Sequence, residues 1–381
     1  MLRPLLAMLA AGLATFNSLY ATQAILPVLA DYFSLTPSQA SWTVSAATGA
    51  LALAIVPASV LSEQFGRGRV IIVSAVCSTV VGLLLPWAPS AWWLIIGRGI
   101  QGVFLAGVPA VAMTWLSEEL SARQLSRAMG VYVAGTSIGG LSGRLIPSGI
   151  LELFTMNPSW GSGVAPWRVA MAASAAFAFV CALLIAMILP PQKNFHPKRL
   201  TLGGEFRAMT SHWANRQLAL LFFLGFVLMG SFVSMYNFIG FRLTQEFGLS
   251  EGVVGAIFLL YLAGTFTSAR AGRWPPARAL LLSSVAYVLS TVVIQSHHLA
   301  LVVAGLLGFT AAFFAAHAIA SSWVGKLATH DRAEASSTYL LCYYAGSSLL
   351  GWSHWSTWLV VVSVVIAAAL FPGLSRLASV E

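Results

Sequence analysis

The chain has 381 residues, of which 58% are hydrophobic and only 8% are charged, and its mean hydropathy is +0.84. Soluble domains carry about 25% charged residues, so this composition excludes an ordinary soluble protein and predicts a membrane protein. The net charge of +9 comes from basic residues scattered over short segments. They form no compact basic patch with interleaved aromatic residues, so we expect no nucleic-acid partner.

Apolar stretches of about 20 residues, the length that crosses a bilayer, recur along the whole chain. They predict an all-α membrane protein with an N-terminal six-helix bundle (1–189), a cytoplasmic linker (190–216) and a C-terminal six-helix bundle (217–381). In the linker, Phe206, Met209 and Trp213 beside Arg207 and Arg216 suggest an interfacial amphipathic helix. The twelve expected spans are 5–30, 41–62, 69–87, 92–116, 127–151, 168–189, 217–241, 252–269, 279–295, 298–323, 335–353 and 354–372.

The two halves contain related sequences. Residues 345–351 nearly repeat residues 134–140 at an offset of 211. Residues 49–66 and 255–272, which are 206 positions apart, each run from a glycine through an apolar stretch to a Gly-Arg pair. A membrane chain of two related halves is typical of a secondary transporter, with a substrate site near the bilayer midplane. We therefore expect two pseudo-symmetric bundles.

Basic residues are distributed unevenly over the expected loops. With the N-terminus in the cytoplasm, 16 of the 20 Lys and Arg residues fall on cytoplasmic segments. Cytoplasmic loops carry an excess of Lys and Arg in membrane proteins. Both termini are therefore expected in the cytoplasm, with the loops near 67, 123, 200, 275 and 330 on the same side. The loops near 89, 160, 247 and 297 are expected outside.

Three motifs resemble those of the major facilitator superfamily. Residues 62–69 (Ser-Glu-Gln-Phe-Gly-Arg-Gly-Arg) resemble its Asp-Arg-x-Gly-Arg-Arg loop, and residues 98–102 resemble its embedded arginine motif. Residues 135–143 resemble the glycine-rich motif of its proton-coupled efflux members. Residues 19–27 and 315–325 are similar to the arabinose efflux permease and drug:proton antiporter branch. The resemblance implies a multi-pass transporter of the bacterial inner membrane, monomeric and without a cofactor.

The sequence also departs from these motifs. Glu63 replaces the loop's Asp, Gln64 replaces its first Arg, and Gly68 stands where a second basic residue is usual. In the glycine-rich motif, Gly140 replaces a proline and Arg144 replaces the last glycine. The resemblance therefore implies the fold, while the direction of transport and any drug specificity stay open.

The loop motif, with Glu63, Gly66, Arg67 and Arg69, has two interpretations. It is either a solvated turn or a cytoplasmic gate, in which basic side chains pair with Glu63 and with the carbonyl end of a neighbouring helix. At a solvated boundary, removing these charges should cost little stability and reduce transport.

Glycines in the fifth expected span favour close helix packing. Gly135, Gly139 and Gly143 are spaced at i, i+4 and i+8, which gives one smooth helix face. Gly346 is expected to serve the same purpose in the eleventh span.

Polar residues inside the expected spans are the candidate substrate-binding residues. An Arg at membrane depth costs at least about 2.5 kcal/mol on insertion scales, so it requires a partner, a wet cavity or a route to the interface. Arg98 is expected as the principal anchor of the substrate or as the group that tunes a proton site. The full candidate set is Tyr20, Gln23, Arg98, Gln101, Arg144, Tyr236, Asn237, Tyr261, His317, Tyr339 and Tyr343.

Acidic residues are absent from the middle third of every expected span. Proton coupling is therefore expected to use Asp31 or Glu152 near the outer mouth, His317, or no side chain that the sequence identifies. A membrane histidine has an alternative role as the hydrogen-bond partner of a facing carbonyl. Tyr339 is equally well explained as an interface anchor.

The sequence offers no nucleophile, base, metal-ligand or ATP-binding constellation, so we expect neither an enzyme nor a metal site. The leading hypothesis is a secondary active transporter that exports a small polar or anionic solute, sugar-like or an organic acid, by proton-coupled alternating access. Its expected partners are the substrate, membrane lipid and protons. The alternatives are an uptake symporter, a uniporter, a multidrug efflux pump or, from a different class, a non-transporting membrane sensor or enzyme.

Overall fold

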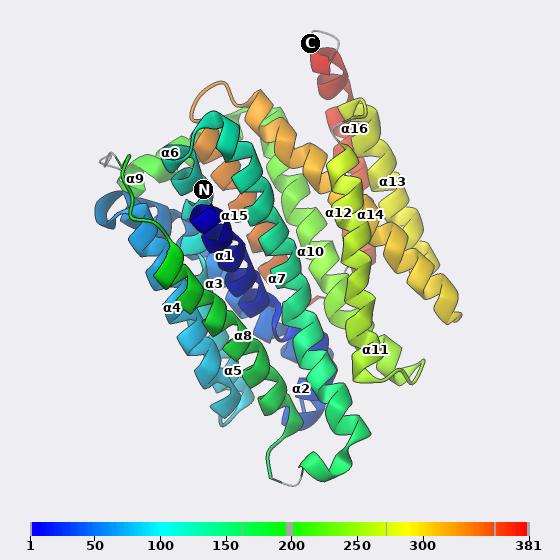
Figure 1. The fold of residues 1–381 in the computed structure, drawn as a ribbon. Coiled ribbons are helices and arrows are strands. Elements are labelled where there is room, and N and C mark those ends of the chain that lie inside the picture. Colours follow the sequence, from blue (N-terminus) through cyan, green and yellow to red (C-terminus); the bar gives the residue numbers. More distant parts are fainter. Residues whose placement is uncertain (1, 162, 196–200, 272, 354–355, 379–381) are drawn as a thin grey trace. The chain divides into compact units, whose positions relative to one another are not determined.

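The structure, a computed structural model, describes residues 2–161, 163–195, 201–271, 273–353 and 356–378. Within these ranges the chain is helical and contains no β-strand (Figure 1). Hydrocarbon offers the backbone no hydrogen-bond partners, so an apolar chain in a bilayer satisfies its amides and carbonyls internally. The linker residues 196–200, Gly272 of the second repeat and the expected start of the last span, 354–355, lie outside the described residues.

Twelve helical segments coincide with the twelve expected spans, which confirms the all-α membrane fold. Among the described residues, nine of them are long enough to cross a membrane and contain a sufficiently apolar stretch. The segments are α1, η1 and α2 (Leu2–Tyr20, Gln23–Ile25, Leu26–Phe33), α3 (Pro37–Phe65), α4 and η2 (Arg67–Leu84, Leu85–Trp87), α5 and α6 (Ala91–Leu105, Gly107–Glu119), α7 (Ala122–Met156), α8 (Pro166–Ile188), α10 (Arg216–Gln245), α11, η5 and α12 (Glu251–Ala256, Ile257–Leu260, Tyr261–Ala271), α13 (Pro276–Ile294), α14 (Leu299–Leu327), α15 (Arg332–Leu350) and α16 (Ser356–Ala378).

Local sequence explains where several of these helices begin and end. Thr36 and Gln39 form a reciprocal capping box at the start of α3, with Pro37 in the first turn. Gly66 separates α3 from α4 with φ of 92°, a conformation that side chains other than glycine rarely adopt. Its amide donates to the Ser62 carbonyl and closes α3. The loop motif therefore sits at a fixed turn.

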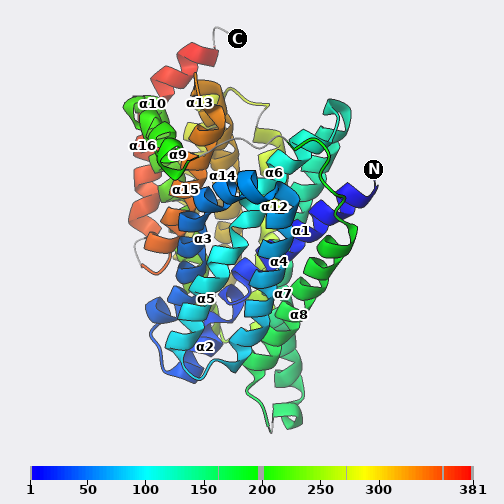
Figure 2. The ribbon, with the colours of Figure 1, turned by 90° about the vertical axis from the view of Figure 1, so that its left-hand side faces the viewer.

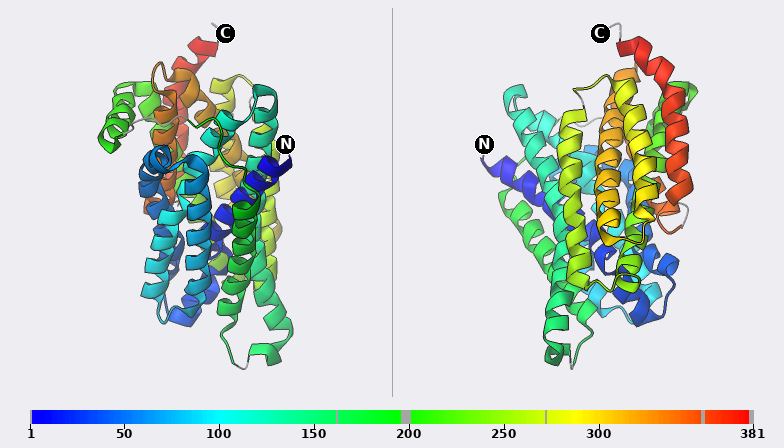
Figure 3. Two further views of the ribbon diagram at one scale, coloured as in Figure 1. Left: turned by 60° about the vertical axis from the view of Figure 1, so that its left-hand side comes forward. Right: turned by 90° about the vertical axis from the view of Figure 1, so that its right-hand side faces the viewer.

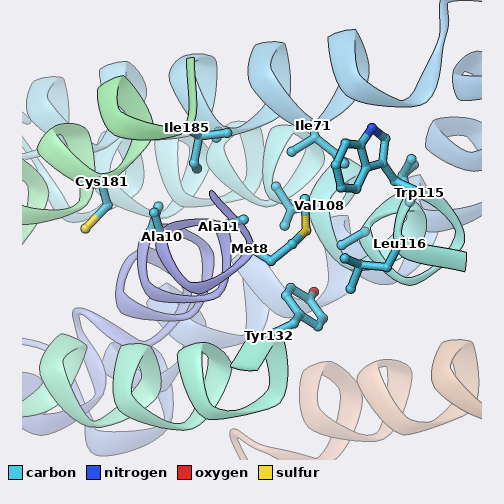
Figure 4. Packing of buried hydrophobic residues seen from close by; sticks show 14 of the residues in the cluster. Met8, Ala10, Ala11, Ile71, Val108, Trp115, Leu116, Tyr132, Cys181 and Ile185 are labelled. Atoms are coloured by element: carbon cyan, nitrogen blue, oxygen red, sulfur yellow. The ribbon is translucent and has the colours of Figure 1, made fainter. Parts of the chain in front are cut away.

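The chain forms two compact units. Unit 1 comprises Met1–Leu202 and Gly240–Ala256. In it, α1 packs against α7 and α8, while α3 packs against α5, and α4 against α8 (Figures 1 and 2). Met8, Trp115, Leu116 and Tyr132 belong to the buried core where α1, α6 and α7 meet (Figure 4).

The second compact unit, unit 2, comprises Gly203–Ile239 and Ile257–Glu381. Here α13 packs against both α14 and α16, and α12 packs against α14 (Figure 3). The short helix α9 (Leu202–Ser211) lies in the expected linker, with Met209 buried and Phe206 exposed; the exposed Trp213 follows in the 3₁₀ turn η4 (His212–Ala214). The division into bundles at residues 190–216 stays a prediction, since Gly240–Ala256 groups with unit 1.

The glycines of α7 lie where this helix meets α1. A Cβ atom on Gly139 would come within 2.6 Å of the Gly12 carbonyl oxygen, and one on Gly143 within 2.4 Å of the Asn17 carbonyl oxygen. Such distances are far inside van der Waals contact, so only glycine allows the two backbones to approach this closely. In unit 2, Gly346 lies equally close to the backbone of Phe226.

We expect Gly143→Ala to destabilise the protein by about 1–3 kcal/mol, the usual cost of overpacking, because neither backbone can retreat without moving a whole helix. Gly149→Ala on the same helix is the matched control, since a Cβ there meets nothing within 4 Å. Thermal unfolding of the two purified variants in detergent measures the difference. Equal midpoints would contradict the packing role of Gly143.

Candidate functional site

Arg144 of α7 lies against the break between α1 and α2. Its Nε and Nη2 donate to Gln23 Oε1 at 2.8 and 2.6 Å, and its Nη1 donates to the Gly140 carbonyl at 2.7 Å. The guanidinium carbon also lies 4.1 Å from the centroid of the Tyr20 ring. Arg144 and Gln23 are each 2% exposed, so a buried cation is held here by neutral groups.

The break in the first span places Tyr20 and Gln23 beside Arg144. Pro27 stands in the first turn of α2. It has no amide hydrogen to donate to the Gln23 carbonyl four residues earlier, which favours an interruption of the helix here. The chain instead forms one turn of 3₁₀ helix, Gln23–Ile25, before α2 begins. The predicted candidates Tyr20, Gln23 and Arg144 are therefore brought together.

Arg98 of α5 is fully buried and makes four hydrogen bonds. Nε donates to the Thr43 carbonyl at 3.0 Å, and the two Nη atoms donate to the Ser18 and Leu19 carbonyls and to Gln101 Oε1. Ser18 and Leu19 belong to the last turn of α1, where the helix dipole favours a positive charge and carbonyls lack helical partners. Arg98 therefore joins α5 to the end of α1 and to α3.

Asn17 was not predicted as a site residue, although an Asn inside an apolar span is a usable signal. It is 0% exposed and lies between Ser142 of α7, at 3.0 Å, and Ser174 of α8, at 2.9 Å. The amide orientation in which its oxygen faces Ser142 and the Gly143 amide satisfies both neighbours. Asn17 thus links three helices beside the α7 glycines.

The loop motif forms a buried ion cluster. Arg67 Nη2 donates to Glu63 Oε1 at 2.6 Å, Nε donates to Glu118 Oε2 at 2.7 Å, and Nη1 donates to Ser62 Oγ at 3.1 Å. Arg67 and Glu63 are only 5% and 4% exposed, so the expectation of a solvated boundary is wrong for this pair. Arg69 is exposed and makes no ion pair with a described residue.

The ion cluster of Glu63, Arg67 and Glu118 extends to the chain after α8. Gln192 Nε2 donates to Glu118 Oε2 at 3.2 Å, and Glu119 Oε1 accepts the backbone amides of Lys193 and Asn194 at 2.9 and 2.8 Å. Sequence reasoning missed Glu118 and Glu119 as partners, because the two acidic residues come from the end of α6. The turn at Gly66, the end of α6 and the start of the linker are therefore held together.

The candidates in unit 2 pair mainly with one another. His317 Nδ1 lies 2.9 Å from Tyr339 Oη, and the Tyr343 ring centroid is 4.6 Å from that of His317. Tyr236 Oη lies 2.6 Å from Thr310 Oγ1, and Asn237 donates to the Gly351 carbonyl at 2.9 Å. Tyr261 packs edge-on against Tyr236 at 4.9 Å. The tyrosines and His317 belong to a larger aromatic core whose extent was not predicted, with Phe232, Phe258, Phe309, Phe313 and Phe314.

The acidic candidates of unit 1 lie near the contact between α7 and α11, with Glu152 on α7 and Asp31 on α2. Glu152 Oε2 accepts the Gly252 amide at 2.9 Å, at the start of α11. Asp31 and Glu152 both lie close enough to Glu251 to act on it electrostatically. Glu251 was not among the predicted coupling residues, because its position at the start of a span gave no reason to pair it with distant acidic residues.

Comparisons with known proteins agree with this architecture. The family model of the Major Facilitator Superfamily matches residues 7–351. The chain is 38% identical to the inner membrane transport protein YnfM of Escherichia coli K12, over 92% of this chain and 82% of the relative. It is 33% identical to the uncharacterized MFS-type transporter YybF of Bacillus subtilis 168, over 96% of this chain and 91% of the relative.

The chain belongs to the major facilitator superfamily, as its motifs predicted. A solved bacterial homologue of the human lysosomal transporter Spinster, in an inward-facing and occupied conformation, shares the fold with a TM-score of 0.76 at 16% identity, over 98% of this chain and 96% of that chain. The protein is therefore a multi-pass membrane transporter of a solute and not an enzyme. Its assignment to the arabinose efflux branch stays a prediction.

Proposed function

We propose that the protein exports a small anionic or polar solute from the cytoplasm by proton-coupled alternating access, as a monomer with both termini in the cytoplasm. The observation that carries this proposal is the buried Arg144 guanidinium against Gln23 and Tyr20. A substrate that reaches this arginine should be an anion, or should carry a polar group that can replace the Gln23 amide oxygen as the acceptor.

Arg144 is a better substrate anchor than Arg98 in this arrangement. Arg98 uses its donors on carbonyls of α1 and α3 and on Gln101, all of them structural partners. Two donors of Arg144 converge on a single side-chain oxygen, that of Gln23, and a side chain can rotate away. A planar guanidinium that presents two parallel N–H groups matches a carboxylate or phosphate bidentately.

Carboxylates support the proposal of proton coupling. Glu152, Asp31 and Glu251 share one end of unit 1, and the Glu152 carboxylate holds the first turn of α11 through the Gly252 amide. A proton on Glu152 would weaken this bond, since a neutral carboxyl is a poorer acceptor than a carboxylate. His317 is the coupling candidate of unit 2, through its bond to Tyr339.

Transport in proteoliposomes tests the proposed function. Purified protein is reconstituted with an imposed pH gradient and challenged separately with organic anions, neutral sugars and lipophilic cations. Proton-coupled export predicts that an organic anion or sugar crosses the membrane in the direction opposite to the protons. An ionophore that removes the proton gradient should abolish accumulation of this solute. Accumulation of cations alone would contradict the anion and sugar assignment. Solute movement unaffected by the ionophore would indicate a uniporter, and movement in the same direction as protons would indicate a symporter.

The proposed orientation predicts which loops are cytoplasmic. Single cysteines near residues 67, 123, 200, 275 and 330 should react with a membrane-impermeant maleimide only after the cells are opened, whereas those near 89, 160, 247 and 297 should react in intact cells. The native Cys77, Cys181 and Cys342 are first replaced by Ser. Reaction of the cysteine near 200 in intact cells would overturn the orientation.

A further inference from the structure

Two apolar grooves lie on the sides of the two units. In unit 1 a groove of about 440 Å³ runs between α3, α4 and α5, along Leu61, Phe65 and Val73, with Arg69 in its lining. These three helices lie side by side in Figure 2. In unit 2 a groove of about 510 Å³ runs between α12, α13 and α14, with Arg270 and Trp274 in its lining. Both volumes lie within the range of about 300–1,000 Å³ that is usual for ligand pockets.

The two grooves occupy equivalent positions in the two repeats. Leu61, Phe65 and Val73 of the first groove are followed 206 positions later by Thr267, Ala271 and Ala279, which line the second. The same offset relates residues 49–66 to 255–272. Grooves that recur in both repeats with different side chains arise from the shared helix geometry rather than from one accidental gap.

A basic side chain lies at the same end of each groove. Arg69 stands in the first turn of α4 and Arg270 in the last turn of α12, so both mark the end of the unit to which the charge distribution assigns the cytoplasm. Both arginines are exposed, and neither makes an ion pair with a described residue. Arg270 instead lies 3.5 Å over the ring of Phe266, which is itself half exposed.

We propose that each groove binds an acyl chain of an anionic glycerophospholipid from the cytoplasmic leaflet, whose headgroup phosphate is bound by Arg69 in unit 1 and by Arg270 in unit 2. An apolar groove that ends at an arginine is complementary to this molecule, which joins a hydrocarbon chain to a negative charge. Basic residues between transmembrane helices on the cytoplasmic side recognise anionic headgroups in other membrane proteins. Trp274 is exposed and follows the end of α12, and Trp is enriched where membrane helices reach the headgroups.

Native mass spectrometry of the purified full-length protein tests this inference, with phosphatidylglycerol or phosphatidylcholine added at equal concentration. The wild type should bind two phosphatidylglycerol molecules in preference to phosphatidylcholine. Arg69→Gln and Arg270→Gln should each weaken one binding event about fivefold, which corresponds to the ~1 kcal/mol expected for one basic residue near an anionic surface. Arg278→Gln is the matched control, because Arg278 is an exposed arginine of α13 outside both grooves.

Two further variants separate the groove from the charge. Ala58→Phe and Ala315→Phe place a ring inside the first and second groove and leave both arginines intact. Each should remove one tightly bound lipid, while glycerol phosphate without acyl chains should not compete. The proposal would be overturned if the wild type bound the two lipids equally, or if Arg278→Gln lost as much phosphatidylglycerol binding as Arg69→Gln and Arg270→Gln. Full lipid binding by both Phe variants would overturn it as well. None of these measurements depends on which solute the protein transports.

Discussion

Arg67→Gln is expected to lower the free energy of unfolding by about 3–5 kcal/mol, the usual cost of removing one partner from a buried ion pair. The substitution leaves Glu63 at 4% exposure without the guanidinium that lies 2.6 Å away, and it also removes the bond to Glu118. Arg69→Gln, two residues further along the chain, should change stability by less than about 0.5 kcal/mol because Arg69 is exposed. Thermal unfolding in detergent compares the two variants directly.

A variant without the three charges separates stability from gating. Replacing Glu63 and Glu118 by Gln together with Arg67→Met leaves no unpaired buried charge, so most of the lost stability should return. If the cluster is also a gate, transport in proteoliposomes should stay impaired in this stable variant. If the triple variant transports as well as the wild type, the cluster has a purely structural role. Equal stability of Arg67→Gln and Arg69→Gln would contradict the argument that Arg67 belongs to a buried ion pair.

The fold can be predicted from the sequence because each membrane span depends on hydrophobicity, a property that nearly all of its residues share. A stretch of about 20 apolar residues crosses a bilayer whatever its neighbours are, so the spans could be placed without knowing a single contact. The helix break at Gln23 was not expected in the same way. Pro27, four residues later, favours the break, but prolines also stand inside the continuous helices α3 and α7, so a proline alone does not predict one.

The candidate site could be predicted only in part, because the hydrogen-bond and ion-pair partners of a side chain depend on which helices meet. Arg67 and Glu63 are four residues apart on the chain, so their pairing was predictable, whereas Glu118 comes from 51 positions away. The roles of the two buried arginines differ for the same reason. Arg98 meets the carbonyl end of α1 and Arg144 meets a side chain, and spacing along α5 and α7 does not distinguish these environments.

Arg144→Lys should weaken binding of the transported anion by about 10- to 150-fold, while the protein stays folded. The substitution keeps the positive charge but loses the planar pair of N–H donors, so one charge-assisted hydrogen bond of about 1.5–3 kcal/mol is lost. Arg144→Gln removes the charge as well and should abolish transport of an anion. Arg242→Lys is the matched control, since Arg242 forms a surface pair with Glu246 at 2.8 Å in the same unit.

The comparison of anionic and neutral solutes completes the test of Arg144. Binding to the purified variants is measured by calorimetry, and transport is measured in proteoliposomes with the solute that the wild type accumulates. If an anion contacts the guanidinium, the Arg144 variants should bind it with lower affinity, while the maximal transport rate changes less. The reason is that the contact is already made in the bound ground state. A neutral sugar should tolerate Arg144→Lys within a few-fold, since lysine still donates to hydroxyl groups. Undiminished binding of an anionic substrate by Arg144→Gln would show that this arginine, like Arg98, serves the structure of unit 1 alone.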